Sequence, residues 1–436
     1  MSNNRLSKVI YIKGTLILLS PLLIGGGEDQ NTEIDLLRDW EGRPFIPGSS
    51  LAGSTRDFLQ RIVSDNSLID TVFGKKADSD TTQSLIIFHD AFLKNKKPRI
   101  QVRDGIEIDT DTKTAKENAK YDYEVLERGN EFEFRLELLL REIHKDKIQQ
   151  IEEILYHIIQ ALKDGKIRIG AKIRRGFGKL RLLNPEVLIL DMNTSEGIER
   201  WIEFDWDFKG NCDIESLNHK LLDIRDIRYD SIKVKFSIPY SFIIRYYSMN
   251  TDEADMIHLC SDGNPVIPGT SWTGALRNAI YNISKELRKE DKIDLLMKDL
   301  FGFVKEEEKE KKASRIYIEE SIIENAYPVF YIRNKVDRFT GGVVEGALFD
   351  EKPIYGSENT IVELDIQIQE ASDKDIGLIL LGLRELWFGI QTVGGEANIG
   401  RGILKGKEIF INENRIDLEN KEDQPYLDAL ATYLSD

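Results

Sequence analysis

The stretch RPFIPGSSLAGSTR, residues 43–56, returns 221 residues later as NPVIPGTSWTGALR, residues 264–277. Both copies place a Pro-Gly turn before a hydroxyl residue and keep an arginine eight positions after the glycine. Proline and glycine favour a sharp turn, and the residues that follow are spaced as in a helix. A motif of this length is hard to repeat by chance, so it indicates an internal duplication.

Other motifs repeat around this one in the same order. Phe73-Gly74 returns as Phe301-Gly302, Asp109 and Thr112 as Asp337 and Thr340, and Gly170, Gly176 and Gly178 as Gly394, Gly400 and Gly402. We therefore predict a first domain over residues 1–184, a linker over 185–229 and a second domain over 230–436.

Each half has the pattern of an α+β domain. In the first half we expect strands at 7–24, 85–102, 131–141 and 179–183, a helix from about Leu51 capped by Ser50, and an amphipathic helix at 148–164. This βαββαβ order is that of ferredoxin-like and RNA-recognition folds. The second half predicts helices near 271–289 and 374–388.

Composition excludes several classes of protein. The 436 residues carry a formal charge of −16, which argues against a protein that coats nucleic acid indiscriminately but allows a local basic groove. Two cysteines, Cys212 and Cys260, cannot form a four-thiolate zinc site and fit a reducing cytoplasm. The apolar stretch at 15–24 is short and contains Pro21, so we expect neither a signal peptide nor a membrane helix.

The repeated turn-helix motif has two interpretations. The first is structural, with a turn, a cap and close packing. The second is a phosphate site, because free amides at the first helical turn attract anions and the arginine could reach the same backbone. Retention of the arginine favours phosphate, and the predicted RNA-binding residues here are Ser49, Ser50, Arg56, Thr270, Ser271 and Arg277.

A glycine-rich loop near the end of each half is a second predicted RNA contact. Between Lys163 and Arg181 there are eight Lys or Arg and one acid, Asp164, a pattern that suits phosphates although a solvated basic face is the alternative. An aromatic residue, Phe177, could stack on a base. The predicted contacts are Lys172, Arg174, Arg175, Gly176, Phe177 and Gly178 in the first loop, and Gly394, Gly395, Asn398, Gly400, Arg401 and Gly402 in the less basic second loop.

Two polar excursions, residues 104–130 and 337–355, occupy matching places in the halves. Long polar excursions from compact domains are usually functional. We predict protruding hairpins, with mobile loops as the alternative.

Together these motifs resemble the RAMP superfamily of CRISPR-associated proteins, most of all the backbone subunits of type III effector complexes. The chain is similar to a fusion of two such subunits, over roughly residues 7–185 and 230–410. The resemblance implies that each domain binds the guide RNA (crRNA), that a thumb hairpin flips out one guide nucleotide, and that a loop aspartate cleaves the target RNA opposite the flip.

Carried onto this sequence, the resemblance assigns the loop aspartate to Asp35, within Ile34-Asp35-Leu36-Leu37-Arg38. The second half offers Asp255, but it lacks a preceding glycine run and has His258 in place of the arginine. Both aspartates are also the expected ligands of Mg²⁺ (or Mn²⁺). A single carboxylate holding a hydrated cation could assist cleavage by the RNA 2′-hydroxyl, but it cannot build a two-metal cage.

Three functions compete at this point. The first is a guide-binding subunit that is also a metal-dependent endoribonuclease, and the second is a scaffold that binds guide and target without cutting. The third, a guide-processing endonuclease of the same superfamily, would need a histidine near the first helix, and His89 lies well beyond it. The expected partners are crRNA, target RNA, a large polymerase-like subunit, further RAMP subunits and a small subunit, in the cytoplasm and without a membrane.

Overall fold

The computed structural model describes residues 4–27, 33–75, 82–109, 112, 114–247, 253–305 and 310–435. The chain forms two compact units. The first contains residues 1–102, 122–173 and 177–227, and the second contains residues 103–121, 174–176 and 228–436. Two short segments from the first half of the sequence therefore have their contacts within the second unit.

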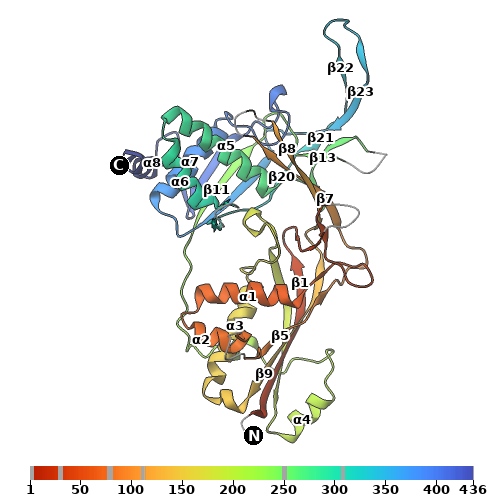
Figure 1. Ribbon diagram of the computed structural model, residues 1–436, viewed down its shortest axis with the longest axis vertical. Helices are drawn as coiled ribbons and strands as arrows, with labels where there is room; N and C mark the ends of the chain where they lie inside the picture. The colour runs from red at the N-terminus through yellow and green to blue at the C-terminus, as the bar shows by residue number, and fades with distance from the viewer. Residues whose placement is uncertain are drawn as a thin grey trace. The chain divides into compact units, whose positions relative to one another are not determined.

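The first unit is built on a four-stranded antiparallel sheet (Figure 1). Its strands are β1 (Leu6–Leu18), β5 (Ile86–Phe88), β9 (Glu131–Arg141) and β10 (Leu180–Asp191), in the spatial order β10-β1-β9-β5. Buried residues alternate with partly exposed ones along the whole of β9, as expected for a strand with one face on the core. The first and third strands in the chain are central, which is the ferredoxin-like arrangement that the sequence predicts.

Three helices contribute to the core of this unit. They are α1 (Gly48–Ile62), α2 (Asn66–Phe73) and α3 (Ile148–Lys163), and their buried side chains join those of the sheet in one cluster. The bounds of α3 confirm the predicted amphipathic helix. The prediction that Ser50 caps α1 is wrong, because the helix begins at Gly48 and its N-cap is Pro47, which places Ser50 inside the first turn.

Residues expected to form a linker instead extend the first unit. β10 continues to Asp191 and is followed by α4 (Ser195–Ile202). The aromatic residues Phe204 and Trp206 then pack on Tyr11 in β1, with ring centroids 3.8 and 5.7 Å away. These rings belong to a second small core that includes Leu188.

The second unit repeats the first with additions. Its sheet contains β11 (Tyr229–Ser237), β19 (Ile316–Ile318), β20 (Ser321–Glu324), β25 (Ile361–Gln369), β26 (Lys405–Ile411) and β27 (Asn414–Ile416). β11 lies between β25 and β26, as β1 lies between β9 and β10. The helices are α5 (Gly269–Leu287), α6 (Glu290–Phe301), α7 (Asp373–Trp387) and α8 (Gln424–Ser435). Two of them, α5 and α7, confirm the predicted helices, and the α+β tandem fold is confirmed.

Short strands complete both units. In the first half they are β2 (Gly25–Gly27), β3 (Asp35–Leu36), β4 (Phe45–Ile46) and β6 (Ala91–Phe92). In the second half they are β12 (Ser241–Phe242), β13 (Arg245–Tyr247), β14 (Met256–His258), β15 (Cys260–Ser261), β16 (Asn264–Ile267), β17 (Phe303–Lys305), β18 (Glu310–Lys312), β21 (Tyr327–Pro328) and β24 (Ile354–Tyr355).

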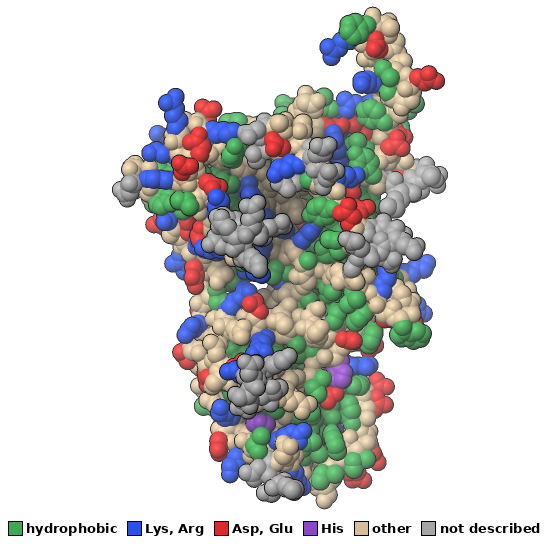
Figure 2. Space-filling model, in the orientation of Figure 1, with side chains coloured by type: hydrophobic (Ala, Val, Ile, Leu, Met, Phe, Trp, Pro, Cys, Tyr) green, Lys and Arg blue, Asp and Glu red, His purple; other side chains and the backbone are tan. Residues whose placement is uncertain are grey.

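Both polar excursions are hairpins. The first is formed by β7 (Ile100–Ile108) and β8 (Ala115–Leu126), and the second by β22 (Tyr331–Val336) and β23 (Val343–Lys352). The second extends away from the sheet of its unit and carries hydrophobic and charged side chains intermixed (Figures 1 and 2).

The repeated Asp-x-x-Thr motif lies at the tips of these hairpins. Asp109 Oδ1 accepts hydrogen bonds from the N–H and hydroxyl of Thr112, and Asp337 Oδ1 accepts the same pair from Thr340. The bonds from the N–H groups of Thr340 and Phe339, and then from the Thr340 hydroxyl, hold the pKa of Asp337 below its usual value. The motif therefore shapes the turn.

Among the helices of the described segments, none combines the length and the apolar character required to cross a bilayer.

Candidate nucleic-acid interface

The turn-helix motifs are shaped by close packing of their glycines. A Cβ on Gly48 would lie 2.1 Å from the carbonyl oxygen of Phe88, and one on Gly269 would lie 2.3 Å from that of Ile318. The glycine is thus needed where each helix starts against a strand end. The predicted contact Ser49 is exposed, whereas Ser50, Thr270 and Ser271 are half-buried.

The two repeated arginines differ in their surroundings. Arg56 donates to Asp70 Oδ1 at 2.6 Å and to the carbonyl oxygen of Gly74 at 3.2 Å, so it ties α1 to the end of α2. Arg277 is exposed on α5, with its guanidinium 5.8 Å from the centre of the Phe301 ring. The structural interpretation of the motif suits Arg56, and the phosphate interpretation suits Arg277.

The first glycine-rich loop does not present Phe177 to a ligand. This side chain is 1% exposed and lies against Tyr123, with the ring centroids 6.4 Å apart. Base stacking by Phe177 stays a prediction, and the buried position of the ring does not favour it. Gly176 and Gly178 on either side have φ of +84° and +73°, which bends the backbone so that the ring enters the core.

The cations of the same loop are partly buried. Lys172 lies 3.3 Å from the centre of the Tyr123 ring in the first unit. In the second unit, the Arg174 guanidinium lies 4.0 Å from the centre of the Tyr317 ring. Burial and then the charge of Arg277 lower the pKa of Arg175 to about 10, against an opposing effect of Tyr121. Two like charges thus lie near each other in the second unit, an arrangement that an anion would stabilise.

The second glycine-rich loop is more open but lacks an available cation at Arg401. That arginine is 5% exposed and forms ion pairs with Glu351 and Glu396. Burial raises the pKa of Glu351, but the bonds from Arg401 and the charge of Arg333 outweigh it and hold the pKa below its usual value. An RNA contact by Arg401 stays a prediction, and it would require these ion pairs to open. Of the other predicted contacts, Gly394, Asn398 and Gly400 are exposed, Gly395 is half-buried and Gly402 is buried.

Sequence reasoning missed one ion pair of the second unit. Arg103, in β7, donates to Glu320 Oε2 at 2.6 Å, and the two side chains are 3% and 2% exposed. No motif in the sequence identifies this pair, because its members are 217 residues apart.

The strand register aligns the acid loops of the two halves. β3 pairs with β2 so that Leu36 lies opposite Gly25, and β14 pairs with β13 so that His258 lies opposite Arg245. The hydrogen bond of the next residue repeats as well, from Leu37 to Ile24 and from Leu259 to Ile244, each at 2.9 Å. Leu36 and His258 are therefore equivalent positions.

This register separates the two predicted aspartates. Asp35, one residue before Leu36, is equivalent to Ile257 and not to Asp255. It is only 7% exposed, in a strand position opposite Gly27, whereas Asp255 is exposed just before β14. The sequence alignment that paired Asp35 with Asp255 is two residues out of register.

The histidines have structural roles in this arrangement. His258 is buried, accepts the N–H of Ile244 at Nδ1 and faces the carbonyl oxygen of Val266 with Nε2, 3.1 Å from each. Burial lowers its pKa to about 4, against smaller opposing effects of backbone hydrogen bonds with Val266 and Phe242. His89 is paired with Glu137 at 2.7 Å.

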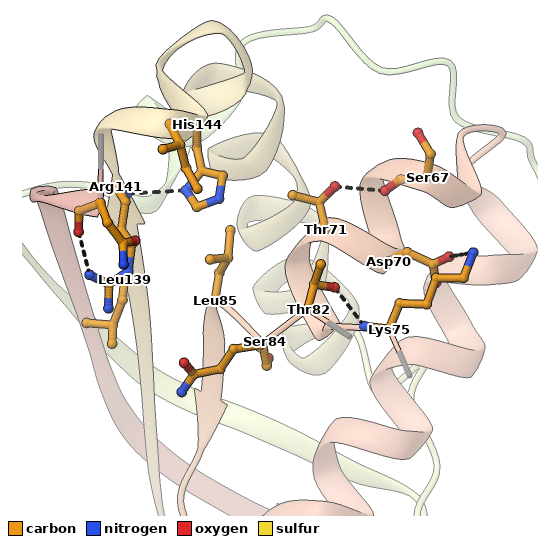
Figure 3. Close-up of a pocket in the computed structure, with 13 residues that line it drawn as sticks. Ser67, Asp70, Thr71, Lys75, Thr82, Ser84, Leu85, Leu139, Arg141 and His144 are labelled. Atoms are coloured by element: carbon orange, nitrogen blue, oxygen red, sulfur yellow. Dashed lines mark hydrogen bonds and ion pairs between the residues drawn. The ribbon is translucent and has the colours of Figure 1, made fainter. Parts of the chain in front are cut away.

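A cavity of about 570 Å³ in the first unit lies between α2, β9 and the residues around Leu85 (Figure 3). Its polar groups are largely bonded to one another, as Lys75 is to Asp70 and the Arg141 N–H is to His144. None of the predicted RNA-binding residues lines it, and neither do the two predicted loop aspartates, Asp35 and Asp255.

Comparison with known proteins agrees with the duplicated site. Residues 15–181 and 260–405 match the RAMP superfamily, one match in each half. The chain is also similar to the CRISPR system Cms endoribonuclease Csm3 of Streptococcus thermophilus, with 28% identity over 152 residues that span 31% of this chain and 68% of the relative. Two ferredoxin-like folds, each with its turn-helix motif, hairpin and glycine-rich loop, and a family match over most of the chain lead to one conclusion: the chain belongs to the RAMP superfamily.

Proposed function

We propose that the chain is a guide-RNA-binding backbone subunit of a type III CRISPR ribonucleoprotein and that it cleaves target RNA. The observation that carries the binding proposal is the cationic site of the second unit. The carbonyl oxygen of Arg175 packs against Gly269 at the start of α5, 2.5 Å from where a Cβ would lie, and burial and then the charge of Arg277 on the same helix lower the pKa of Arg175. A phosphate between them would relieve this repulsion, and the first-turn amides of α5 favour the same charge.

The binding proposal is tested by charge reversal and salt. Arg174→Glu with Arg175→Glu should weaken guide binding and lower the slope of log affinity against log salt by about one unit for each lost phosphate contact. Arg181→Glu is the matched control, since Arg181 is exposed outside the loop. Unchanged affinity across the salt series would remove this site.

The hairpins supply the second part of the proposal. We expect β7–β8 and β22–β23 to interrupt the guide–target duplex at a regular spacing, because they occupy matching places in the two halves. The exposed side chains of the second hairpin include Phe339, Ile332 and Leu348, which suit contact with unstacked bases. Footprinting that shows an unbroken duplex across this subunit would count against it.

Cleavage is proposed to proceed by attack of the RNA 2′-oxygen on the adjacent phosphorus. The 2′-hydroxyl loses its proton, the P–O5′ bond breaks, and O5′ takes up a proton, which leaves a cyclic phosphate and a 5′-hydroxyl. One carboxylate near the 2′-hydroxyl can accept the first proton, and alignment of the nucleotide supplies much of the remaining rate. Of the two aspartates predicted from the sequence, the exposed Asp255 is better placed for this role than the buried Asp35.

A divalent cation fits these residues only as a loosely held, hydrated ion. In the described segments there is no group of three or more His, Cys, Asp or Glu that could enclose a metal. Asp255 and Asp350 do lie together, since the N–H of Asp255 donates to Asp350 Oδ1 at 2.7 Å. Mg²⁺ is often bound through one or two carboxylates while it keeps several waters. When bound there, it would supply charge neutralisation at the scissile phosphate.

Asp255→Asn tests cleavage within the reconstituted complex. We expect loss of one target-RNA cut in Mg²⁺, by about 10²–10⁴-fold if the carboxylate moves a proton, with guide and target binding unchanged. A complex that keeps every product band would show that Asp255 makes no cut. The same result with Asp35→Asn added would support the second candidate, a scaffold without nuclease activity. The remaining partners that we propose are further RAMP subunits, a large polymerase-like subunit and a small subunit, in the cytoplasm.

A further inference from the structure

A turn of the first unit presents a tryptophan to solvent. Trp40 lies between β3 and β4, and its side chain is 89% exposed. An aromatic side chain stabilises a fold by being buried, so one in this position adds little to the folding of its own unit. Tryptophan is, however, among the residues that contribute most to binding when they are buried at a protein interface.

Hydrogen bonds hold this turn in one conformation. Asp39 Oδ1 accepts the N–H groups of Glu41 and Arg43 at 2.9 and 2.8 Å. The N–H of Asp39 donates to the carbonyl oxygen of Arg43 at 2.8 Å, and Arg38 donates to that of Gly42 at 3.2 Å. Because the backbone beneath the indole is already ordered, a partner that binds there loses less entropy in ordering it.

The second half forms the equivalent turn without an aromatic residue. Arg38 bridges Pro44 across the first turn. Cys260 pairs with Pro265 across the second, which identifies the two turns as equivalent. The second turn, residues 261–264, reads Ser-Asp-Gly-Asn and is one residue shorter than the first. The fold thus closes this turn without a tryptophan, so the tryptophan of the first half has no role that the fold itself requires.

Two further aromatic residues follow on the strands next to this turn. Phe45 in β4 pairs with Phe92 in β6, and the two rings stack with centroids 5.9 Å apart. Phe92 is 41% exposed, and Phe45 is half-buried. The equivalent pair in the second half is aliphatic, Val266 with Ile322. Trp40 and the stacked pair, together called the aromatic set below, thus distinguish the first half from the second.

The charges beside the indole favour a protein partner over RNA. Arg43 forms ion pairs with both Asp39 and Glu41. Arg38 is paired with Glu124 at 2.8 Å. Platforms that stack single-stranded RNA combine aromatic rings with cations for the phosphates, whereas both arginines of this turn are bonded to acids. The centres of protein interfaces are rich in aromatic residues and poor in unpaired charge, as this turn is.

From these observations we propose that Trp40 anchors a docking site for a second protein, different from this chain, that offers an apolar pocket for the indole. Residues 39–43 contain two acids and one arginine, so a cation at the rim of that pocket would complement them. The duplicated chain has the aromatic set once, so one copy of the partner is expected per chain. The inference rests on the proposed function only for the choice of partners to be tested.

The test uses the full chain with guide RNA and the separately purified large, small and further RAMP subunits, and it measures the affinity of each subunit for the chain. Trp40→Ser should weaken the binding of one subunit by about 30-fold or more, the loss expected for a buried tryptophan anchor. Guide affinity and thermal unfolding should stay unchanged. The difference in fluorescence between the parent and Trp40→Phe should move to shorter wavelength when that subunit binds.

Two further variants separate docking from folding. Replacement of residues 39–43 by Ser-Asp-Gly-Asn should act as Trp40→Ser does, because the second half closes its turn with this sequence. Ile322→Ser is the matched control, since Ile322 is 37% exposed at the position equivalent to Phe92. It should leave the affinity for every subunit unchanged, whereas Phe92→Ser should weaken the same subunit as Trp40→Ser, by a smaller factor.

Three results would overturn the proposal. If Trp40→Ser weakens guide binding and leaves every subunit affinity intact, the indole contacts RNA. If it abolishes self-association of the chain, the turn is an interface between copies. If it changes none of these, the turn has no docking role. A chain that binds no guide RNA would remove the proposed function instead, and subunit affinities measured without RNA would still decide the docking site.

Discussion

The glycine-rich loops of the two halves share a backbone and differ in their chemistry. In the first half, the Lys172 ammonium lies over the Tyr123 ring, and Phe177 packs beside the same ring. The equivalent positions in the second half are Glu396, Glu351 and Arg401, which form a buried network of ion pairs. An aromatic cluster with one cation has thus been replaced by two acids and an arginine.

The backbone constraints explain how both versions fit. Lys172 and Glu396 have φ of +56° and +63°, and Gly176 and Gly400 both have φ of +84°. A Cβ on Gly178 would lie 1.9 Å from the carbonyl oxygen of Ile169, a contact that only glycine avoids. Backbone shape is therefore fixed at a few positions, and the side chains between them are free to differ, provided that each buried group finds a partner.

The largest expected effect comes from breaking the ion-pair network. Arg401→Met leaves Glu351 and Glu396 without their main cation, and removal of one partner from a buried pair typically costs about 3–5 kcal/mol. We expect a fall of this size in the free energy of unfolding of the second unit, measured by urea denaturation with hydrogen exchange to assign the unit.

The control transfers the chemistry of the first half. The triple variant Glu351→Tyr, Glu396→Lys and Arg401→Phe should recover most of the stability lost in Arg401→Met, because well-packed apolar groups can replace a buried ion pair without loss. Failure to recover would show that the two loops are not interchangeable.

The next effect is the pH dependence that His258 gives to the second unit. The folded pKa of His258, about 4, lies below its usual value of 6.5. The unfolded chain therefore binds more protons between these values, and the stability of the unit should fall by up to about 3 kcal/mol as pH drops from 6.5 to 4. The first unit has Leu36 at this position and should lack this contribution. The His258→Leu variant should be less stable at pH 6.5, and its free energy of unfolding should lack this fall between pH 6.5 and 4.

The two repeated arginines give a smaller contrast. Arg277→Ala should weaken guide binding and lower its salt slope by about one unit. Arg56→Ala should leave guide binding unchanged and cost about 1 kcal/mol of stability, since its ion pair with Asp70 is about one third exposed. Equal effects of the two substitutions on RNA binding would contradict the different roles given to them.

The smallest effect is expected at Lys172. Lys172→Met keeps much of the apolar side chain and removes the charge above Tyr123, which should cost about 0.5–1 kcal/mol. Thermal unfolding of the first unit measures it. A larger loss would indicate that the charge has a further structural partner.

The duplication, the α+β fold and the matching hairpins could be predicted from the sequence. These properties depend on local signals, such as the turn before α1, the period of α3 and the tip bonds of Asp109 and Asp337, and each signal lies within a few residues of its effect. Because these signals occur twice, the fold could be predicted from this single sequence.

Which side chains are exposed at the site depends on long-range packing, which the sequence does not show. Phe177 and Arg401 occupy equivalent positions in the two loops, and each faces inward because glycines flank it. The residue type, aromatic or cationic, therefore did not predict that the side chain is buried. The acids were paired wrongly for a related reason. A shift of two residues keeps the side-chain alternation of a strand, so sequence spacing could not fix which residues of the two loops are equivalent. The hydrogen bonds from the N–H groups of Glu33 and Asp255 to Asp122 and Asp350 fix this register from a strand about 90 residues away.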